Sequence, residues 1–135
     1  MPQPDLPPPG SPADWLRHAK ADLALAQVPL PVGGLFNTLC FHAQQAAEKS
    51  VKAVLIACGI EPPKVHSLTR LVDLLPAGKR TDKCLLAASD LTTYATTFRY
   101  PGDDDDDVSE EEYRAALNIA QQVVAWAEIA IRHHG

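Results

Sequence analysis

The sequence predicts an all-α protein: an antiparallel four-helix up-and-down bundle with one short extra helix between the second and third long helices. Two observations predict it. Apolar residues recur at steps of three and four along four long stretches, which is the spacing of one face of a helix. Pro and Gly residues fall between these stretches, and no segment alternates apolar and polar residues as a half-buried strand would.

The chain begins with a Pro-rich segment, residues 1–11, which has no apolar periodicity and is expected to be a disordered tail. Residues 12–135 form the predicted helical domain. Ser11 can cap the first helix and Pro12 suits its first turn, because Ser accepts from an unpaired backbone N–H and Pro has none to satisfy. This helix is expected from Pro12 to about Gln27.

The second helix organises the chain and is expected from about Val32 to Cys58, with Gly59 as its C-terminal cap. It is apolar over most of its circumference, which indicates a central and mostly buried helix. Its polar residues lie along one line, and they are His42, Gln45, Lys49 and Lys52. Buried polar groups need partners, so this row either binds phosphate and base or forms a network that fixes the helix register. Lys52 is expected to be exposed.

Three more helices follow. A short helix is expected over Leu68–Leu75, and a third long helix over Thr81–Thr97, where apolar residues alternate at steps of four and three. The last helix is expected from Glu110 to about His133. Ser109 and Glu112 have the spacing of a capping box, which indicates where that helix begins.

The composition is that of one globular domain. The chain has 135 residues, of which 46% are hydrophobic and 21% charged. No apolar run is long enough to span a membrane and the N-terminus lacks the pattern of a secretory signal, so we expect a cytoplasmic protein without membrane contact. The formal net charge of −5 disfavours nonspecific binding to duplex nucleic acid.

Neither the acidic run nor the cysteines predict a metal site. Asp103–Asp107 is either a flexible, self-repelling loop or a group that collects Mg²⁺ or Ca²⁺, although the ligand spacing of an EF-hand is absent. Cys40, Cys58 and Cys84 lie in helical patterns and are expected to be free thiols. No Cys or His spacing is typical of zinc, so we predict no metal ligand and no cofactor.

Three segments, in this order, resemble the HEPN family of small helical-bundle proteins. They are CFHAQQAAEKSVKAVLIACG at residues 40–59, PKVHSLTRLVDLL at residues 63–75 and TTYATTFRYPG at residues 92–102. The resemblance spans about residues 12–132. It implies a four-helix bundle with a short extra helix, a homodimer, and association with nucleotide or RNA. It also implies frequent pairing with a small nucleotidyltransferase, often as a toxin–antitoxin set.

Many members of this family are metal-independent endoribonucleases that use an Arg and a His a few residues apart. Arg99 stands near the position of that Arg, but Asp103–Asp107 come soon after it and no His does. The resemblance therefore does not carry over a catalytic pair. Arg99 is a catalytic candidate only if a His comes from elsewhere in the fold.

Six residues are candidates for nucleotide or RNA binding, namely His42, Gln45, Lys49, His66, Arg99 and Tyr100. His66 follows a Pro-Pro turn and is either a ligand or proton-transfer group or a turn residue bonded to local backbone. Arg99 either grips phosphate or complements the end of its helix. Tyr100 either stacks on a base or serves packing.

Three functions follow as hypotheses. The first, favoured by the incomplete catalytic motif, is a non-catalytic nucleotide- or RNA-associated partner of a minimal nucleotidyltransferase. The second is an endoribonuclease toxin in which His42 or His66 lies near Arg99. The third is a purely structural, dimeric interaction module. Trp126 with Ile119 either belongs to a dimer face or is only a partly exposed aromatic with its neighbour.

Overall fold

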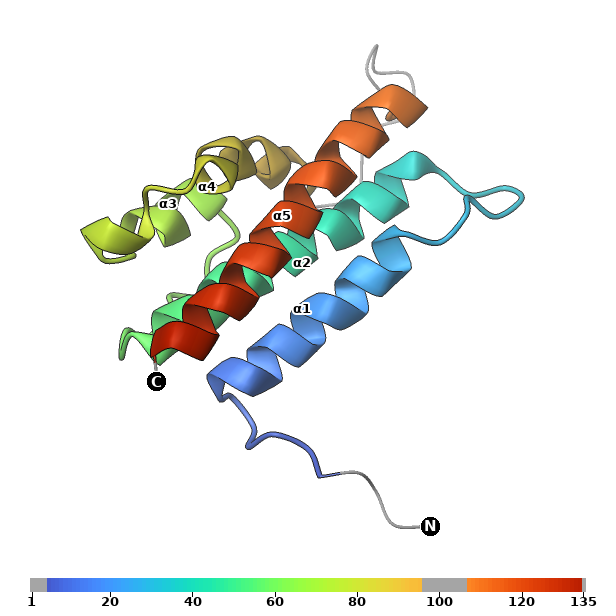
Figure 1. The fold of residues 1–135 in the computed structure, drawn as a ribbon. Helices are drawn as coiled ribbons and strands as arrows, with labels where there is room; N and C mark the ends of the chain where they lie inside the picture. The colour runs from blue at the N-terminus through green and yellow to red at the C-terminus, as the bar shows by residue number, and fades with distance from the viewer. Residues whose placement is uncertain (1–4, 96–106, 135) are drawn as a thin grey trace.

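All regular structure in the described residues, 5–95 and 107–134 of this computed structural model, is helical (Figure 1). The α-helices are α1 (Pro12–Ala26), α2 (Phe36–Ala57), α3 (Leu68–Asp73), α4 (Lys83–Ala88) and α5 (Glu110–His134), and the 3₁₀ helices are η1 (Ala77–Lys79) and η2 (Ser89–Tyr94). The predicted all-α class is confirmed. None of the described helices is long and apolar enough to cross a membrane.

The first helix begins where the capping residues predict. The Ser11 hydroxyl accepts a hydrogen bond from the backbone N–H of Asp14 at 3.2 Å, and the Asp14 carboxylate accepts from the N–H of Gly10 at 3.0 Å. Pro12 occupies the first helical position. These contacts satisfy backbone donors that the helix itself leaves unpaired, and they fix the start of α1.

The second helix begins later than predicted, at Phe36 rather than near Val32. The N–H of Gly34 donates to the carbonyl of Pro31 at 2.9 Å, and Gly33 has a φ of +81°, so this segment is a turn. Such a φ suits Gly and cannot continue a right-handed helix. At the other end the predicted Gly59 cap is present, with a φ of +78°.

The third long helix differs from the expectation for Thr81–Thr97. It is a short α-helix, α4, that tightens into the 3₁₀ helix η2, and residues 96 and 97 lie outside the described part. Two polar side chains bond to backbone here: Ser89 Oγ donates to the carbonyl of Leu86 at 3.3 Å, and Thr92 Oγ1 accepts from the N–H of Leu68 at 3.1 Å. Ser and Thr are weak helix formers because their side chains compete for backbone groups, which accounts for the change.

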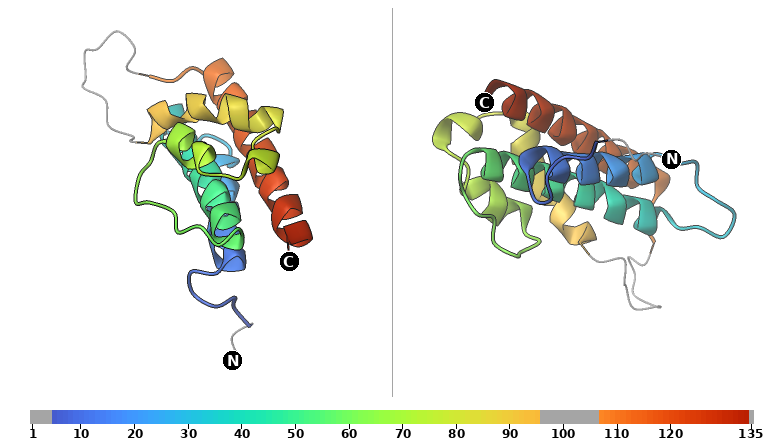
Figure 2. Two further views of the ribbon diagram at one scale, coloured as in Figure 1. Left: turned by 90° about the vertical axis from the view of Figure 1, so that its left-hand side faces the viewer. Right: turned by 90° about the horizontal axis from the view of Figure 1, so that it is seen from below.

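The long helices lie side by side, with α1 antiparallel to both α2 and α5 (Figure 1). Figures 1 and 2 together show α1 on one side of α2 and the α3–α4 segment on the other. The fourth place in the bundle is therefore filled by α4 and η2. The core to which α2 and α5 contribute contains buried small residues, which let helix backbones approach closely: Ala43, Ala47, Ala116, Ala120 and Ala127.

An aromatic pair fixes three helix ends at the same place. The rings of Phe36 and Tyr113 stack with centroids 5.0 Å apart, and the Tyr113 hydroxyl donates to the carbonyl of Ala26. The end of α1, the start of α2 and the first turns of α5 are thereby joined. Further along α5, Ile119 and Trp126 pack partly buried against the core.

Candidate functional site

The polar row of α2 meets a carboxylate from α1. Asp22 Oδ1 lies 3.0 Å from Nδ1 of His42, and Asp22 Oδ2 accepts a hydrogen bond from Nζ of Lys49 at 2.5 Å. All three side chains are only partly exposed. The structure thus brings two of the predicted site residues together through a residue that the sequence reasoning did not single out. Gln45 is half-buried on the same helix.

A second cluster, the Glu48 cluster, lies beside the first on α2. The Glu48 side chain is only 4% exposed and both of its oxygens are engaged. Oε1 accepts from Gln44 Nε2 at 3.0 Å and lies 2.9 Å from His66 Nδ1, while Oε2 accepts from Lys52 Nζ at 3.0 Å. The Lys52 ammonium supplies the counter-charge that a buried carboxylate needs, and Gln44 and His66 occupy its other oxygen.

These hydrogen bonds decide the charge state of Glu48. Burial raises the pKa of its carboxyl, but the hydrogen bonds from Gln44, His66 and Lys52 and the charge of Lys52 together outweigh burial and hold the pKa below its usual value. Glu48 is therefore a carboxylate at neutral pH. Lys52, which we expected to be exposed, is instead 8% exposed, because its ammonium is drawn to this carboxylate.

The Glu48 cluster also connects α2 to the segment before α3. Gln44 Nε2 donates to the backbone carbonyl of His66 at 3.4 Å, in addition to the contact between the His66 ring and Glu48. The His66 side chain itself remains 66% exposed. One edge of the imidazole is thus held by a buried carboxylate while most of the ring faces solvent.

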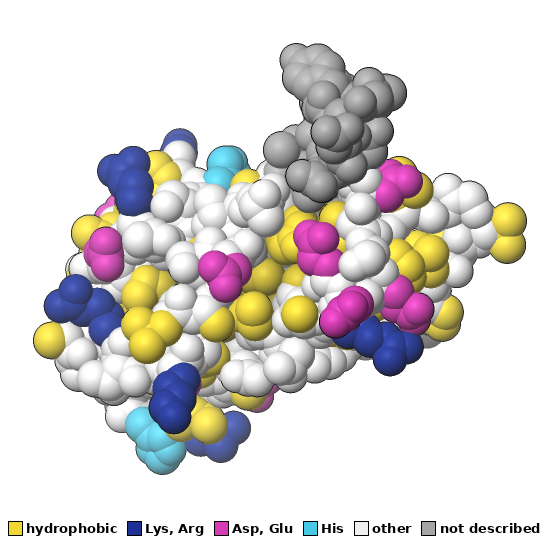
Figure 3. Space-filling model, turned by 90° about the horizontal axis from the view of Figure 1, so that it is seen from above, with side chains coloured by type: hydrophobic (Ala, Val, Ile, Leu, Met, Phe, Trp, Pro, Cys, Tyr) yellow, Lys and Arg dark blue, Asp and Glu magenta, His cyan; other side chains and the backbone are white. Residues whose placement is uncertain are grey.

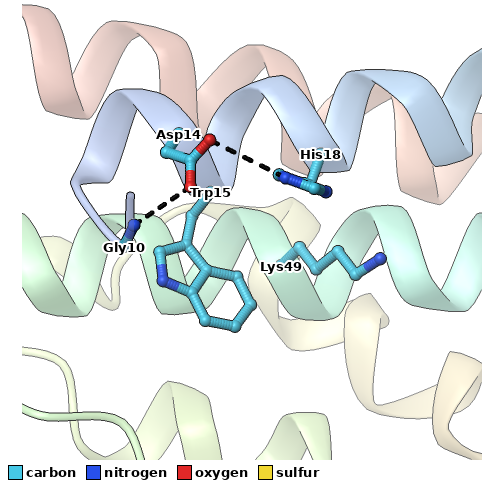
Figure 4. Close-up of a pocket in the computed structure, with 5 residues that line it drawn as sticks. All are labelled: Gly10, Asp14, Trp15, His18 and Lys49. Carbon is cyan, nitrogen blue, oxygen red and sulfur yellow. Dashed lines mark hydrogen bonds and ion pairs between the residues drawn. The ribbon is translucent and has the colours of Figure 1, made fainter. Parts of the chain in front are cut away.

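One hollow of the surface lies where α1 begins, next to Lys49 (Figure 4). It has a volume of about 300 Å³ and is lined by Gly10, Asp14, Trp15, His18 and Lys49. The Asp14 carboxylate is turned toward its own helix, where the N–H of Gly10 and the guanidinium of Arg17 hold its pKa below the usual value.

A second hollow adjoins it, because Trp15 and Gly10 line both. Its volume is about 440 Å³, and its other lining residues are Lys52, Ile56, Glu61, Pro62, Pro63 and Lys64. The ammonium of Lys52 lies over the Trp15 ring, 5.6 Å from the centroid, which is a cation–π distance. The indole therefore forms a wall shared by two neighbouring hollows.

The structure separates the predicted site residues into groups. His42 and Lys49 share Asp22, His66 belongs to the Glu48 cluster, and Arg99 and Tyr100 lie outside the described residues. Most of the acidic run, Asp103–Asp107, lies outside them as well. Within the part of the chain that is described, no group of three or more His, Cys, Asp or Glu side chains could hold a metal ion.

The sequence contained a signal for one missed group and none for the other. Gln44, Glu48 and Lys52 are spaced four residues apart, so they lie on one face of a helix and can bond in succession. That spacing could have identified the Glu48 cluster. Asp22 and Trp15 are single residues on another helix, and only the packing of α1 on α2 brings them to the site.

The fold and the site together define a small helical bundle whose central helix carries two internal clusters of paired charges. The model of the HEPN domain family matches residues 12–130, and the chain belongs to the HEPN family. This agrees with the resemblance seen in three segments of the sequence.

Two solved structures are similar over nearly their whole length. One is ST0689, an archaeal HEPN homologue, at 29% identity and a TM-score of 0.68. The other is TT1696 from Thermus thermophilus, at 31% identity and a TM-score of 0.73. Each comparison covers 90% of this chain and 98% of the other. No curated protein matches the chain.

Proposed function

We propose that this chain is a nucleotide- or RNA-associated HEPN protein that works as an accessory, toxin-type partner of a minimal nucleotidyltransferase in the cytoplasm. The proposed binding residues are His42, Gln45, Lys49, His66, Arg99 and Tyr100. Membership of the HEPN family supports the association with nucleotide or RNA.

The observation that carries the proposal is the position of Lys49. Its ammonium is paired with Asp22 and its side chain also lines the hollow beside Trp15 (Figure 4). A partly exposed cation at a hollow with an aromatic wall suits a ligand that has both a phosphate and a base. His42, which contacts the other oxygen of the same carboxylate, adds a second donor at this place.

A homodimer is part of this proposal, and the face of α4 and α5 is the surface we propose for it. Figure 3 shows hydrophobic side chains along the middle of one face, with carboxylates among them and Lys and Arg side chains toward both of its ends. Leu86 on α4 is 72% exposed and Ile129 on α5 is 54% exposed. Trp126 and Ile129 also line a hollow of about 280 Å³ beside the start of α4, into which a partner residue could insert.

The experiment is a thermal shift with ATP, for the chain alone and for the chain mixed with a minimal nucleotidyltransferase. Binding raises the melting temperature, and Lys49→Ala is expected to reduce that rise. Lys20→Ala is the matched control because Lys20 is also a cation paired with a carboxylate, Glu128, but it lines neither of the hollows beside Trp15. If no nucleotide shifts the melting temperature in either setting, the binding proposal fails and a structural interaction module remains.

One observation favours the second candidate, a metal-independent endoribonuclease. The Nδ1 edge of the exposed His66 ring contacts buried Glu48, and a carboxylate on one ring nitrogen orients the other for proton transfer. Arg99, which lies outside the described residues, would have to supply the cation that RNA cleavage also needs. This candidate predicts cleavage of RNA that is lost in both Arg99→Ala and His66→Ala, and intact RNA after long incubation with excess protein would exclude it.

A further inference from the structure

Among the described residues, Trp15 is the one aromatic side chain that lines both hollows at the start of α1. In Figure 4 its ring projects from α1 toward α2, and Lys49 extends from α2 beside it. The indole is half-buried, so part of it faces the solvent-filled space. A flat aromatic surface in this setting has a function beyond packing only if it is held in place and if a ligand can reach it.

The Glu48 cluster holds the ring in place. Lys52 is fixed by its hydrogen bond to the buried carboxylate of Glu48, and its ammonium lies over the Trp15 ring. Lys52 lines the larger hollow but not the smaller one. The cation therefore supports the indole from the side of the larger hollow and leaves the smaller hollow with an uncovered aromatic wall. A surface fixed before binding loses little freedom when a ligand arrives.

The smaller hollow also supplies donors for an anion. Lys49 and His18 line it, and Asp14 is the only carboxylate among the described residues of its lining. Asp14 accepts from the N–H of Gly10 and the guanidinium of Arg17, and the His18 ring makes only a longer contact with it, 3.7 Å from Nε2 to Oδ1 (Figure 4). Its volume of about 300 Å³ lies at the lower end of the range for small-molecule sites. The hollow thus suits one flat ring and one phosphate.

We infer that Trp15 is the stacking surface for a single base, and that Lys49 and His18 take the attached phosphate. The ligand is one nucleotide unit, either a free nucleotide or one residue of a single-stranded RNA. This inference rests on the proposed function and assigns its ligand to a place and an orientation. Trp15 and His18 were not among the binding residues predicted from the sequence.

The chain contains two tryptophans, which makes the inference directly measurable. In Trp126→Phe, the fluorescence reports on Trp15 alone, and in Trp15→Phe it reports on Trp126 alone. AMP, ATP and single-stranded oligo(A) are the probes. We expect saturable quenching in Trp126→Phe and none in Trp15→Phe. Quenching by oligo(A) at lower concentrations than by AMP would identify RNA as the source of the base, and the reverse order would identify a free nucleotide.

Affinity variants test the same contact without fluorescence. Trp15→Phe keeps a ring and should retain binding, whereas Trp15→Leu should weaken it about tenfold, since stacking on one aromatic ring is worth about 1–3 kcal/mol. Circular dichroism checks that both variants fold. A thermal shift with ATP that persists in Trp15→Leu, together with unchanged fluorescence in Trp126→Phe, would overturn this inference alone. If neither a thermal shift nor quenching is seen with any nucleotide in the unmodified chain, both this inference and the proposed function are overturned.

Discussion

His66 Nδ1 lies 2.9 Å from Oε1 of Glu48, so a largely exposed imidazole contacts a carboxylate buried in the centre of the bundle. Through this contact the segment before α3 is attached to α2. The same carboxylate holds Lys52, whose ammonium lies over Trp15 of α1. One buried charge therefore organises groups from three parts of the chain.

Glu48→Gln should destabilise the fold strongly. The change removes the charge but keeps the size, and it leaves the nearly buried ammonium of Lys52 without a counter-charge. Breaking a buried ion pair from one side costs about 3–5 kcal/mol, and we expect a loss of about 3 kcal/mol in the free energy of unfolding. Urea unfolding measures it.

Glu110→Gln is the control for that variant. Glu110 pairs with Arg114 at 2.9 Å on the exposed surface of α5, and such pairs contribute about 0.3–0.5 kcal/mol. Equal losses in the two variants would show that the Glu48 pair is no stronger than a surface pair.

The stability contributed by Glu48 should depend on pH. Its pKa in the folded protein is held below the ordinary value of 4.5, so the unfolded chain takes up the proton first as pH falls. The contribution is therefore complete above about pH 4.5 and is lost as pH decreases through the lower, folded pKa. The difference in unfolding free energy between the unmodified chain and Glu48→Gln should narrow over that range. A difference that stays constant down to about pH 3 would contradict the lowered pKa.

Asp22→Asn should have opposite effects on stability and on binding. It removes the ion pair with Lys49, which costs about 1 kcal/mol for a partly exposed pair. It also removes a negative charge that competes with phosphate for Lys49, so the proposed nucleotide should bind more tightly. Glu128→Gln, which frees Lys20 in the same way, is the control and should leave affinity unchanged. Calorimetry measures the affinity for ATP in each variant. Weaker binding in Asp22→Asn than in the unmodified chain would argue against Lys49 as the phosphate ligand.

The three cysteines should differ in reactivity. Burial, followed by the neighbouring Asp82 carboxylate, raises the pKa of the Cys84 thiol to about 12, so almost no thiolate is present at about pH 8. Cys40 is also buried, whereas Cys58 is half-buried near the end of α2. A thiol reagent should therefore label Cys58 faster than the other two cysteines, and Cys58→Ser should abolish this fast phase of labelling. Fast labelling that survives this substitution would contradict the assignment.

The long helices α1, α2 and α5 could be predicted because their apolar spacing, caps and breakers all agree. Ser11, Gly59 and Ser109 stand at or next to the helix ends, and each has the role expected of it. The second helix starts late because Gly33 adopts a left-handed conformation, which the apolar pattern does not reveal. The predicted length of the third long helix, Thr81–Thr97, is too great because the apolar spacing of α4 continues through η2. Between the apolar residues lie Ser89 and Thr92, whose side chains bond to backbone groups and weaken the α-helix.

The candidate site could be predicted only in part, for a related reason. A polar row on one helix is visible in the sequence, and His42 and Lys49 do lie together. Their shared partner, Asp22, comes from another helix, and the rotation of α1 against α2 decides which of its side chains reaches the row. Periodicity constrains that rotation too loosely to select one residue.

Thr92→Val tests how η2 is attached to α3. The Thr92 hydroxyl accepts from the backbone N–H of Leu68, the buried first residue of α3, and Val has the same shape without an acceptor. A buried donor left without its partner costs about 1–3 kcal/mol, so we expect Thr92→Val to lose about 1 kcal/mol or more of unfolding free energy. Thr93→Val makes the same change on an exposed neighbour in η2 and should cost less than about 0.5 kcal/mol. Hydrogen exchange at the Leu68 amide should accelerate only in the first variant, because only there does this donor lose its acceptor. If both variants unfold alike and the amide stays protected, the hydroxyl does not hold α3 in place, and packing of the apolar seam alone joins the two segments.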